Sequence, residues 1–198
     1  MSGKVRWLTI CTLLALLVAG WVWRYTTMNA FYASKTSSRR EIYPVGEAVP
    51  FGTDVYAGKS RAEGYFLRVD SFEIVDREEY AEKNGLDPET MRAGDRLALV
   101  HVTLVNKNSE AEGVSLTEFQ LHGVDNYAGL NWDLLLTANP VLGENYGIRL
   151  SKGTEYALTI PYDLDKQYFS TYTWNHMNRY AFYFQVTVYP IAKDIQVQ

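Results

Sequence analysis

Residues 97–106 read LALVHVTLVN, and this stretch decides the fold class. The positions on one side of it are uniformly apolar: Ala98, Val100, Val102 and Leu104. The other side carries polar residues such as His101 and Thr103. A period of two is typical of a strand with one face in a core. The sequence therefore predicts a half-buried β-strand over these residues.

Similar strands recur on both sides of this one. Near the end of the chain, one side carries Phe182, Phe184, Val186 and Val188. The apolar phase switches within 65–75, which predicts a bulge near Ser71. Further strands are expected at 118–122, 148–150 and 155–162, separated by turns rich in Asn, Ser and Gly. The pattern predicts an all-β fold, an immunoglobulin-like antiparallel β-sandwich.

One helix is expected as an insertion among the strands. Residues 77–84 read REEYAEKN and end at Gly85, which occupies the usual helix-stopping position. Asp76 stands where a side chain caps a helix start. The segment 123–147 is a long excursion with no clear period, so its structure is the hardest to predict.

Composition narrows the class of protein. A chain of 198 residues with 47% hydrophobic and 21% charged residues fits one globular domain with an appendage. Residues 1–40 hold six of the nineteen basic residues and no acidic ones, so 41–198 carry thirteen basic against twenty-three acidic. An acidic body without a basic stripe does not favour nucleic-acid binding. Cys11, the one cysteine, leaves no partner for an intramolecular disulfide.

The N-terminal segment predicts a membrane anchor. Residues 7–23 read WLTICTLLALLVAGWVW, without a charge, and tryptophans stand at both ends. We expect a cytoplasmic N-terminus at 1–6, a transmembrane signal-anchor helix at 7–24, a linker at 25–42 and an extracytoplasmic domain at 43–198. The alternatives are a signal peptide cleaved near Val18-Ala19-Gly20 and a buried core helix.

Several short motifs follow one another along the body. They are Gly94-Asp95-Arg96 with Val100-x-Val102-x-Leu104-x-Asn106, Ser151-x-Gly153 before a strand, and Tyr189-Pro190 after the last alternating run. Tyr43-Pro44-Val45-Gly46 opens the same region. Together they resemble the immunoglobulin-like extracytoplasmic domains of unknown function that Gram-positive bacteria tether by one N-terminal helix. This resemblance, over 43–198, implies a fold and a location, and it implies no catalytic or binding residue.

Motifs of catalysis and metal binding are missing from the sequence. It contains no Gly-x-Ser-x-Gly elbow, no His-Glu-x-x-His helix, no Gly-rich phosphate loop and no cysteine in the body. His101, His122 and His176 are isolated from one another. The acidic run over 76–89 has helical spacing, unlike the alternating ligands of a calcium loop. We expect no cofactor, no metal ion and no enzymatic activity.

Two aromatic loops are the predicted binding surface. Residues 168–180 mix rings with amides and hydroxyls, a composition typical of surfaces that recognise glycans or peptides. The excursion 123–147 adds Tyr127 and Trp132. The alternative is that 168–180 simply covers the open end of a sandwich. The candidates are Tyr168, Tyr172, Trp174, His176, Tyr180, Tyr127 and Trp132.

These features predict a non-catalytic binding or assembly module of the cell envelope. Its expected partners are membrane lipid, through the anchor, and an envelope protein, peptide or wall polymer. One alternative is an accessory or sensor subunit whose helix pairs with a membrane transporter or signalling complex. An envelope hydrolase is the least favoured alternative, because it would need an acidic or histidine-containing pocket.

Overall fold

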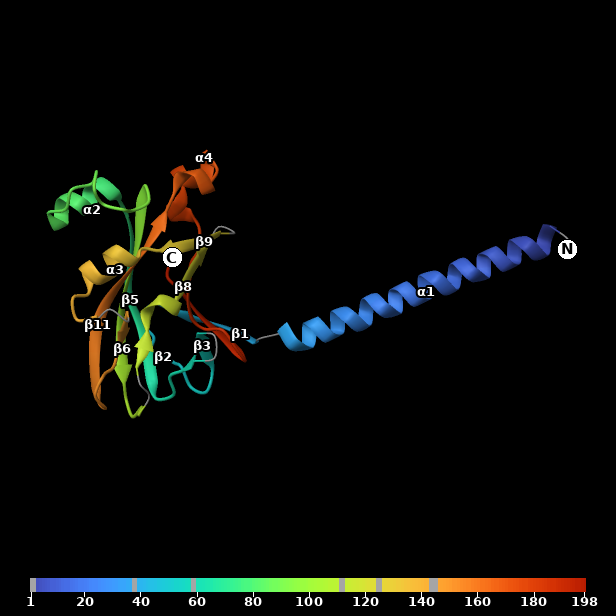
Figure 1. Cartoon of the computed structure of the whole chain (residues 1–198), viewed down its shortest axis with the longest axis horizontal. Coiled ribbons are helices and arrows are strands. Elements are labelled where there is room, and N and C mark those ends of the chain that lie inside the picture. The colour runs from blue at the N-terminus through green and yellow to red at the C-terminus, as the bar shows by residue number, and fades with distance from the viewer. Residues whose placement is uncertain (1–2, 37–38, 58–59, 111–112, 124–125, 143–145) are drawn as a thin grey trace. The chain divides into compact units, whose positions relative to one another are not determined.

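The computed structural model forms two compact units, residues 1–38 and 39–198, which are described separately (Figure 1). It describes residues 3–36, 39–57, 60–110, 113–123, 126–142 and 146–198. The described part of the first unit is a single helix, and the second unit contains the strands.

Helix α1 (Gly3–Thr36) is longer than the predicted anchor. It continues past Arg24, because no glycine or proline interrupts residues 21–43, and the first strand begins at Arg39. The predicted linker of 25–42 is therefore mostly helix and strand. Among the residues that the structure describes, no helix is both long enough and apolar enough to span a membrane.

Nine strands of the second unit form one continuous sheet, in the order β1-β13-β12-β8-β9-β11-β6-β5-β2. Their bounds are β1 (Arg39–Pro44), β2 (Val49–Pro50), β5 (Tyr65–Asp76), β6 (Arg96–Asn106), β8 (Gln120–Gly123), β9 (Asn126–Leu130), β11 (Thr154–Leu164), β12 (Phe182–Thr187) and β13 (Ile191–Gln196). Two small pairs lie outside it: β3 (Val55–Ala57) with β4 (Ser60–Arg61), and β7 (Val114–Ser115) with β10 (Gly147–Ile148).

The all-β prediction is confirmed, but the sheet is closer to a barrel than to a clear immunoglobulin sandwich. Strand β9 pairs with both β8 and β11, which joins two halves that a sandwich keeps apart. The segment after β1 then crosses toward the far edge, where Gly46 N donates to Val69 O at 2.8 Å. Strand β9 lies in the excursion 123–147, whose sequence gave no alternation to predict it.

The core follows the predicted alternation. Ala98, Val100, Val102 and Leu104 are buried inside the curved sheet, and the pairing of β5 with β6 shifts register between Val69 and Ser71, which confirms the bulge. The odd positions Leu97 and Leu99 are buried as well, because Tyr80 and Leu134 from two helices cover them from outside. The alternation near the end of the chain stops at Thr187, and Val188 is exposed.

Short helices and 3-10 turns connect several of the strands. They are α2 (Arg77–Asn84), α3 (Trp132–Ala138), α4 (Thr171–Asn175) and the 3-10 turns η1 (Leu116–Glu118), η2 (Lys166–Tyr168) and η3 (Met177–Arg179). The predicted helix and its Gly85 stop, at φ 66°, are confirmed. Asp76 does precede the helix, but its side chain makes no capping bond and instead accepts a hydrogen bond from Arg96 Nε at 2.8 Å.

Candidate binding surfaces

Helix α4 forms because Ser170 caps it, with Thr173 N donating to Ser170 Oγ at 3.1 Å. Its Trp174 is only 6% exposed and packs against Phe169, with ring centroids 5.9 Å apart. The Arg96 guanidinium lies over the indole ring at 4.5 Å and donates through Nη1 to the Trp174 carbonyl at 3.0 Å. Trp174 therefore anchors the loop to the sheet and does not present its ring to a ligand.

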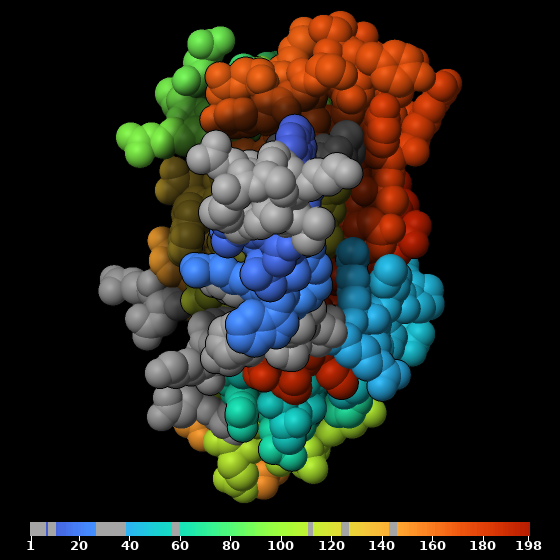
Figure 2. All heavy atoms as spheres, turned by 90° about the vertical axis from the view of Figure 1, so that its right-hand side faces the viewer, coloured from blue at the N-terminus to red at the C-terminus, as the bar shows by residue number. Residues whose placement is uncertain are grey.

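The exposed rings of the same loop lie around that anchor. Tyr172 is 62% exposed and stacks on His176 with centroids 4.4 Å apart. His176 Nδ1 lies 2.8 Å from the Tyr172 carbonyl, and Tyr168 is also exposed. Tyr180 is half-buried. Residues of this part of the chain, drawn in orange, gather at one end of the domain (Figure 2).

The two remaining candidates lie elsewhere. Trp132 begins α3 and meets Tyr146 edge to face at 5.1 Å. Tyr127, on β9, faces His122 on β8. The seven residues predicted from the sequence thus fall in three separate places and do not form one continuous surface.

A polar cavity of about 450 Å³ lies where the loop 168–180 meets β5 and α2. Its lining combines three kinds of side chain. The apolar ones are Phe72, Ile74 and Met177, the charged ones are Glu73, Asp76, Glu79 and Arg96, and the amides are Asn175, Asn178 and Gln198. Sequence reasoning missed this cavity, because its walls come from two distant parts of the chain, residues 72–96 and residues 175–198.

Negative charge is in excess around this cavity. The one cation in its lining, Arg96, is already bound to Asp76 and to the Trp174 carbonyl. Glu73 faces His101, with Oε1 3.3 Å from Nε2. Within the described part of the chain, the Glu79 side chain has neither a hydrogen bond nor an ion pair. The cavity therefore favours a positively charged group.

A second surface lies on the outer face of the β1-β13-β12-β8-β9 half of the sheet. Four planar groups stack there in a row. The His122 ring lies 5.6 Å from Tyr127 and 5.6 Å from Tyr183, and the Arg40 guanidinium lies 4.8 Å above Tyr183. The alternation of β12 predicts that Tyr183 points outward, whereas Arg40 falls within the predicted linker of 25–42.

The carboxylate of Asp194 lies beneath this row and is only 2% exposed. Arg40 Nε donates to its Oδ2 at 2.6 Å. Its other oxygen, Oδ1, is buried with no hydrogen-bond partner in the described part of the chain, and His122 Nε2 lies 3.7 Å away. A buried acceptor without a donor lowers the stability of the fold and is rare in folded proteins, so this oxygen distinguishes the row from an ordinary sheet surface.

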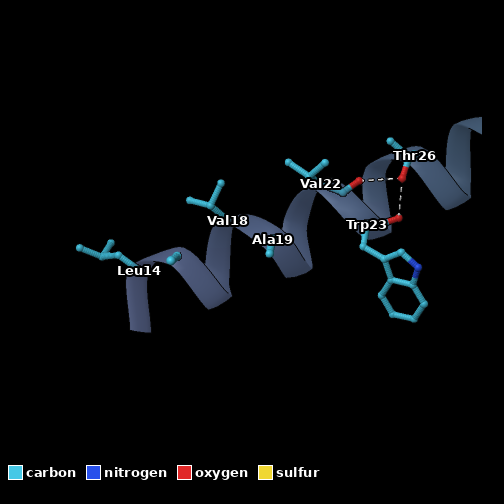
Figure 3. A pocket seen from close by; sticks show the side chains of 7 residues that line it. Leu14, Val18, Ala19, Val22, Trp23 and Thr26 are labelled. Carbon is cyan, nitrogen blue, oxygen red and sulfur yellow. Dashed lines mark hydrogen bonds between the residues drawn. The ribbon is translucent and has the colours of Figure 1, made fainter. Parts of the chain in front are cut away.

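Helix α1 has its own shallow hollow on one face. Leu14, Val18 and Val22 line one side of it (Figure 3). Ala15 and Ala19 also line it, and their short side chains leave the helix backbone less covered there. At its end, Thr26 Oγ1 donates to the carbonyls of Val22 and Trp23 at 2.9 and 3.0 Å. Small residues on one face of an apolar helix are typical of helix–helix contacts in membranes.

No group of three or more His, Cys, Asp or Glu side chains is arranged to hold a metal ion among the residues that the structure describes. The three histidines have different contact partners. His101 contacts Glu73 and Thr159, His122 contacts Asp194, and His176 contacts Tyr172.

Comparison with known proteins identifies the domain. The model of a domain of unknown function, DUF5028, matches residues 40–193. The chain belongs to the DUF5028 family. No curated protein matches the sequence. The crystal structure of the yjhA protein from Bacillus subtilis is similar with a TM-score of 0.43 and 10% identity, over 79% of this chain and 99% of that one.

Proposed function

We propose that this DUF5028 protein is a non-catalytic binding module of the cell envelope. In this proposal, α1 anchors it in the cytoplasmic membrane and the domain faces outward. The uncharged run 7–23 with its terminal tryptophans supports the anchor. So does the exposure of apolar α1 side chains such as Leu13, Leu17 and Val18, which a bilayer would cover.

The cavity beside the loop 168–180 is the proposed site, and its excess of carboxylates is the observation that carries the proposal. Residues 39–198 carry fifteen basic and twenty-three acidic residues, so the whole domain also attracts cations. The partner is therefore expected to be an envelope protein or peptide that inserts a lysine or arginine side chain. The apolar floor of Phe72, Ile74 and Met177 suits the aliphatic stem of such a residue.

In-cell crosslinking tests this function. A photo-crosslinking amino acid at Asn178, on the cavity lining, is introduced into the full chain, and adducts are identified by mass spectrometry. We expect a defined protein adduct that Glu79→Gln removes. The matched control is Glu82→Gln, an exposed glutamate of the same helix that does not line the cavity. An adduct that survives Glu79→Gln, or the lack of any adduct, contradicts the proposal.

A second candidate function is an accessory or sensor subunit of a membrane complex, and the hollow on α1 favours it. Replacing residues 8–23 by an unrelated apolar helix of equal length separates the two functions. A surface-binding module retains its Asn178 adduct after the exchange, because the cavity is unchanged. A subunit that works through its helix loses copurification with its membrane partner.

A further inference from the structure

We propose that the outer face of the β1-β13-β12-β8-β9 half is a second binding site, which takes an uncharged glycan strand. This site is separate from the cavity, and none of its residues lines that cavity. The face consists of Arg40, Gln120, His122, Tyr127, Tyr183 and Gln185.

Strand pairing sets these side chains in two rows. Tyr183 is opposite His122 and His122 is opposite Tyr127, so rings occupy neighbouring positions across three strands. Gln185 is opposite Gln120 in the parallel row next to them. With strands roughly 4.8 Å apart, the face from β13 to β9 spans about 14 Å. This length fits several sugar units and exceeds a single one.

The inner neighbours of these residues fix their direction. Phe182, Phe184 and Leu121 are fully buried in the core, so the residues between and beside them point outward. Tyr127 is 72% exposed. The outward direction is therefore a property of the strands and does not depend on a loop conformation.

The chemistry of the face matches sugars. Within the described part of the chain, the carboxamides of Gln120 and Gln185 make no hydrogen bond. A carboxamide both donates and accepts, as each sugar hydroxyl does. Tyr127 offers an exposed ring against which the C–H face of a sugar packs, and its hydroxyl adds a further polar group. Amides with exposed aromatic rings therefore provide both kinds of contact.

Charge distinguishes a glycan from the partner proposed for the cavity. The one cation of the face, Arg40, is neutralised by Asp194, and the described residues of the face carry no exposed carboxylate. In a domain with eight more acidic than basic residues over 39–198, this is a neutral area. It does not attract a cationic peptide, and it offers no free charge to compensate a charged polymer for its loss of water. An uncharged strand meets no electrostatic penalty.

The unpaired oxygen of Asp194 lies close to the rings of this site. The 3.7 Å between His122 Nε2 and Asp194 Oδ1 exceeds a normal hydrogen bond by roughly 0.7 Å. A glycan that packs against Tyr127 lies next to the His122 ring, whose centroid is 5.6 Å from that of Tyr127. Binding therefore changes the environment of the His122 ring, even though His122 is largely covered by its two tyrosine neighbours.

Calorimetric titration of the full chain tests this inference, in a detergent without a sugar headgroup. The probes are the hexamers of β-1,4-linked glucose and of β-1,4-linked N-acetylglucosamine, which distinguish a plain from an acetamido-bearing glycan. We expect binding of at least one hexamer, weakened about tenfold or more by Tyr127→Ala and by the pair Gln120→Ala with Gln185→Ala. The matched control is Tyr156→Ala, an exposed tyrosine of β11 outside both sites, which leaves binding unchanged.

NMR of the histidine side chains supplies a second readout. We expect the His122 ring signals to shift on titration with the bound hexamer, while those of His101 do not. Binding of neither hexamer overturns the inference, as does binding that the variants leave unchanged in folded protein. The outcome is independent of the Asn178 crosslink, because either site can fail while the other is retained.

Discussion

Arg40 and Asp194 join the first and last strands of the sheet, with Nε 2.6 Å from Oδ2 across the parallel pairing of β1 with β13. The chain enters the domain at β1, one residue before this contact. The Arg40 side chain is 48% exposed, whereas the Asp194 side chain is buried. The same guanidinium lies over Tyr183. One side chain therefore fixes an edge strand by an ion pair and a ring contact together.

We expect Arg40→Ala to lower the free energy of unfolding by about 1–3 kcal/mol. Removing the partner of a fully buried carboxylate costs about 3–5 kcal/mol, and the exposure of Arg40 reduces that figure. Urea unfolding of both proteins measures the difference. Arg39→Ala is the matched control. The Arg39 side chain is 78% exposed where it pairs with Glu41, so its removal should change stability by less than about 0.5 kcal/mol. Equal effects would show that the Asp194 contact is not stabilising.

The sequence predicted the strands whose apolar residues alternate, and it failed where alternation was absent. Strand β1 reads RREIYP, which looks like a basic linker, yet its backbone pairs with β13. Strand β9 has only five residues and includes a glycine. Because these two strands decide whether the sheet closes, the sequence could predict an all-β fold but not its near-barrel form.

The candidate sites illustrate the same limit. Composition identified Tyr127 and the rings of 168–180, because such rings are conspicuous in sequence. It could not identify Glu79 and Asn178 as neighbours, since only the curvature of the sheet brings α2 to the loop before β12. Nor could it separate Trp174 from Tyr172, two residues apart, because only packing shows which ring is covered.

The difference between those two rings is testable. Trp174→Ala should lower the free energy of unfolding by about 3–5 kcal/mol, because it empties a buried position and removes the ring under Arg96. Tyr172→Ala should change it by less than about 0.5 kcal/mol. Thermal or urea unfolding compares them. A Trp174 variant as stable as the unsubstituted protein would contradict its role as the anchor of the loop.

Gly64 gives a test of the turn that starts β5. Its φ is +88°, and an added Cβ would lie 2.6 Å from Asn108 Oδ1 and 2.8 Å from Ser109 N. Gly64→Ala therefore combines about 1–2 kcal/mol of backbone strain with a clash of about 1–3 kcal/mol. Gly153 has a φ of +76° but open space around it, so Gly153→Ala carries only the strain. Equal unfolding midpoints for both variants would refute the close approach at Gly64.

Asp163 predicts a dependence of stability on pH. Its Oδ1 accepts hydrogen bonds from Gly94 N at 2.8 Å and from Asn131 Nδ2 at 2.9 Å. Burial nevertheless raises the pKa of Asp163 above its ordinary value of 3.8, because desolvation outweighs these two bonds. The folded protein therefore holds the proton more tightly than the unfolded chain does.

The sign of the effect follows from this order of pKa values. The stability contributed by the protonated group is complete below the unfolded pKa and is lost as the pH rises through the folded pKa. Asp163→Asn cannot ionise, so it lacks this loss. The free energy of unfolding of the unsubstituted protein minus that of Asp163→Asn should decrease between pH 3.5 and pH 7, as measured by urea unfolding across that range. A difference that stays constant or increases with pH would mean that the hydrogen bonds from Gly94 and Asn131 outweigh the burial of the carboxylate.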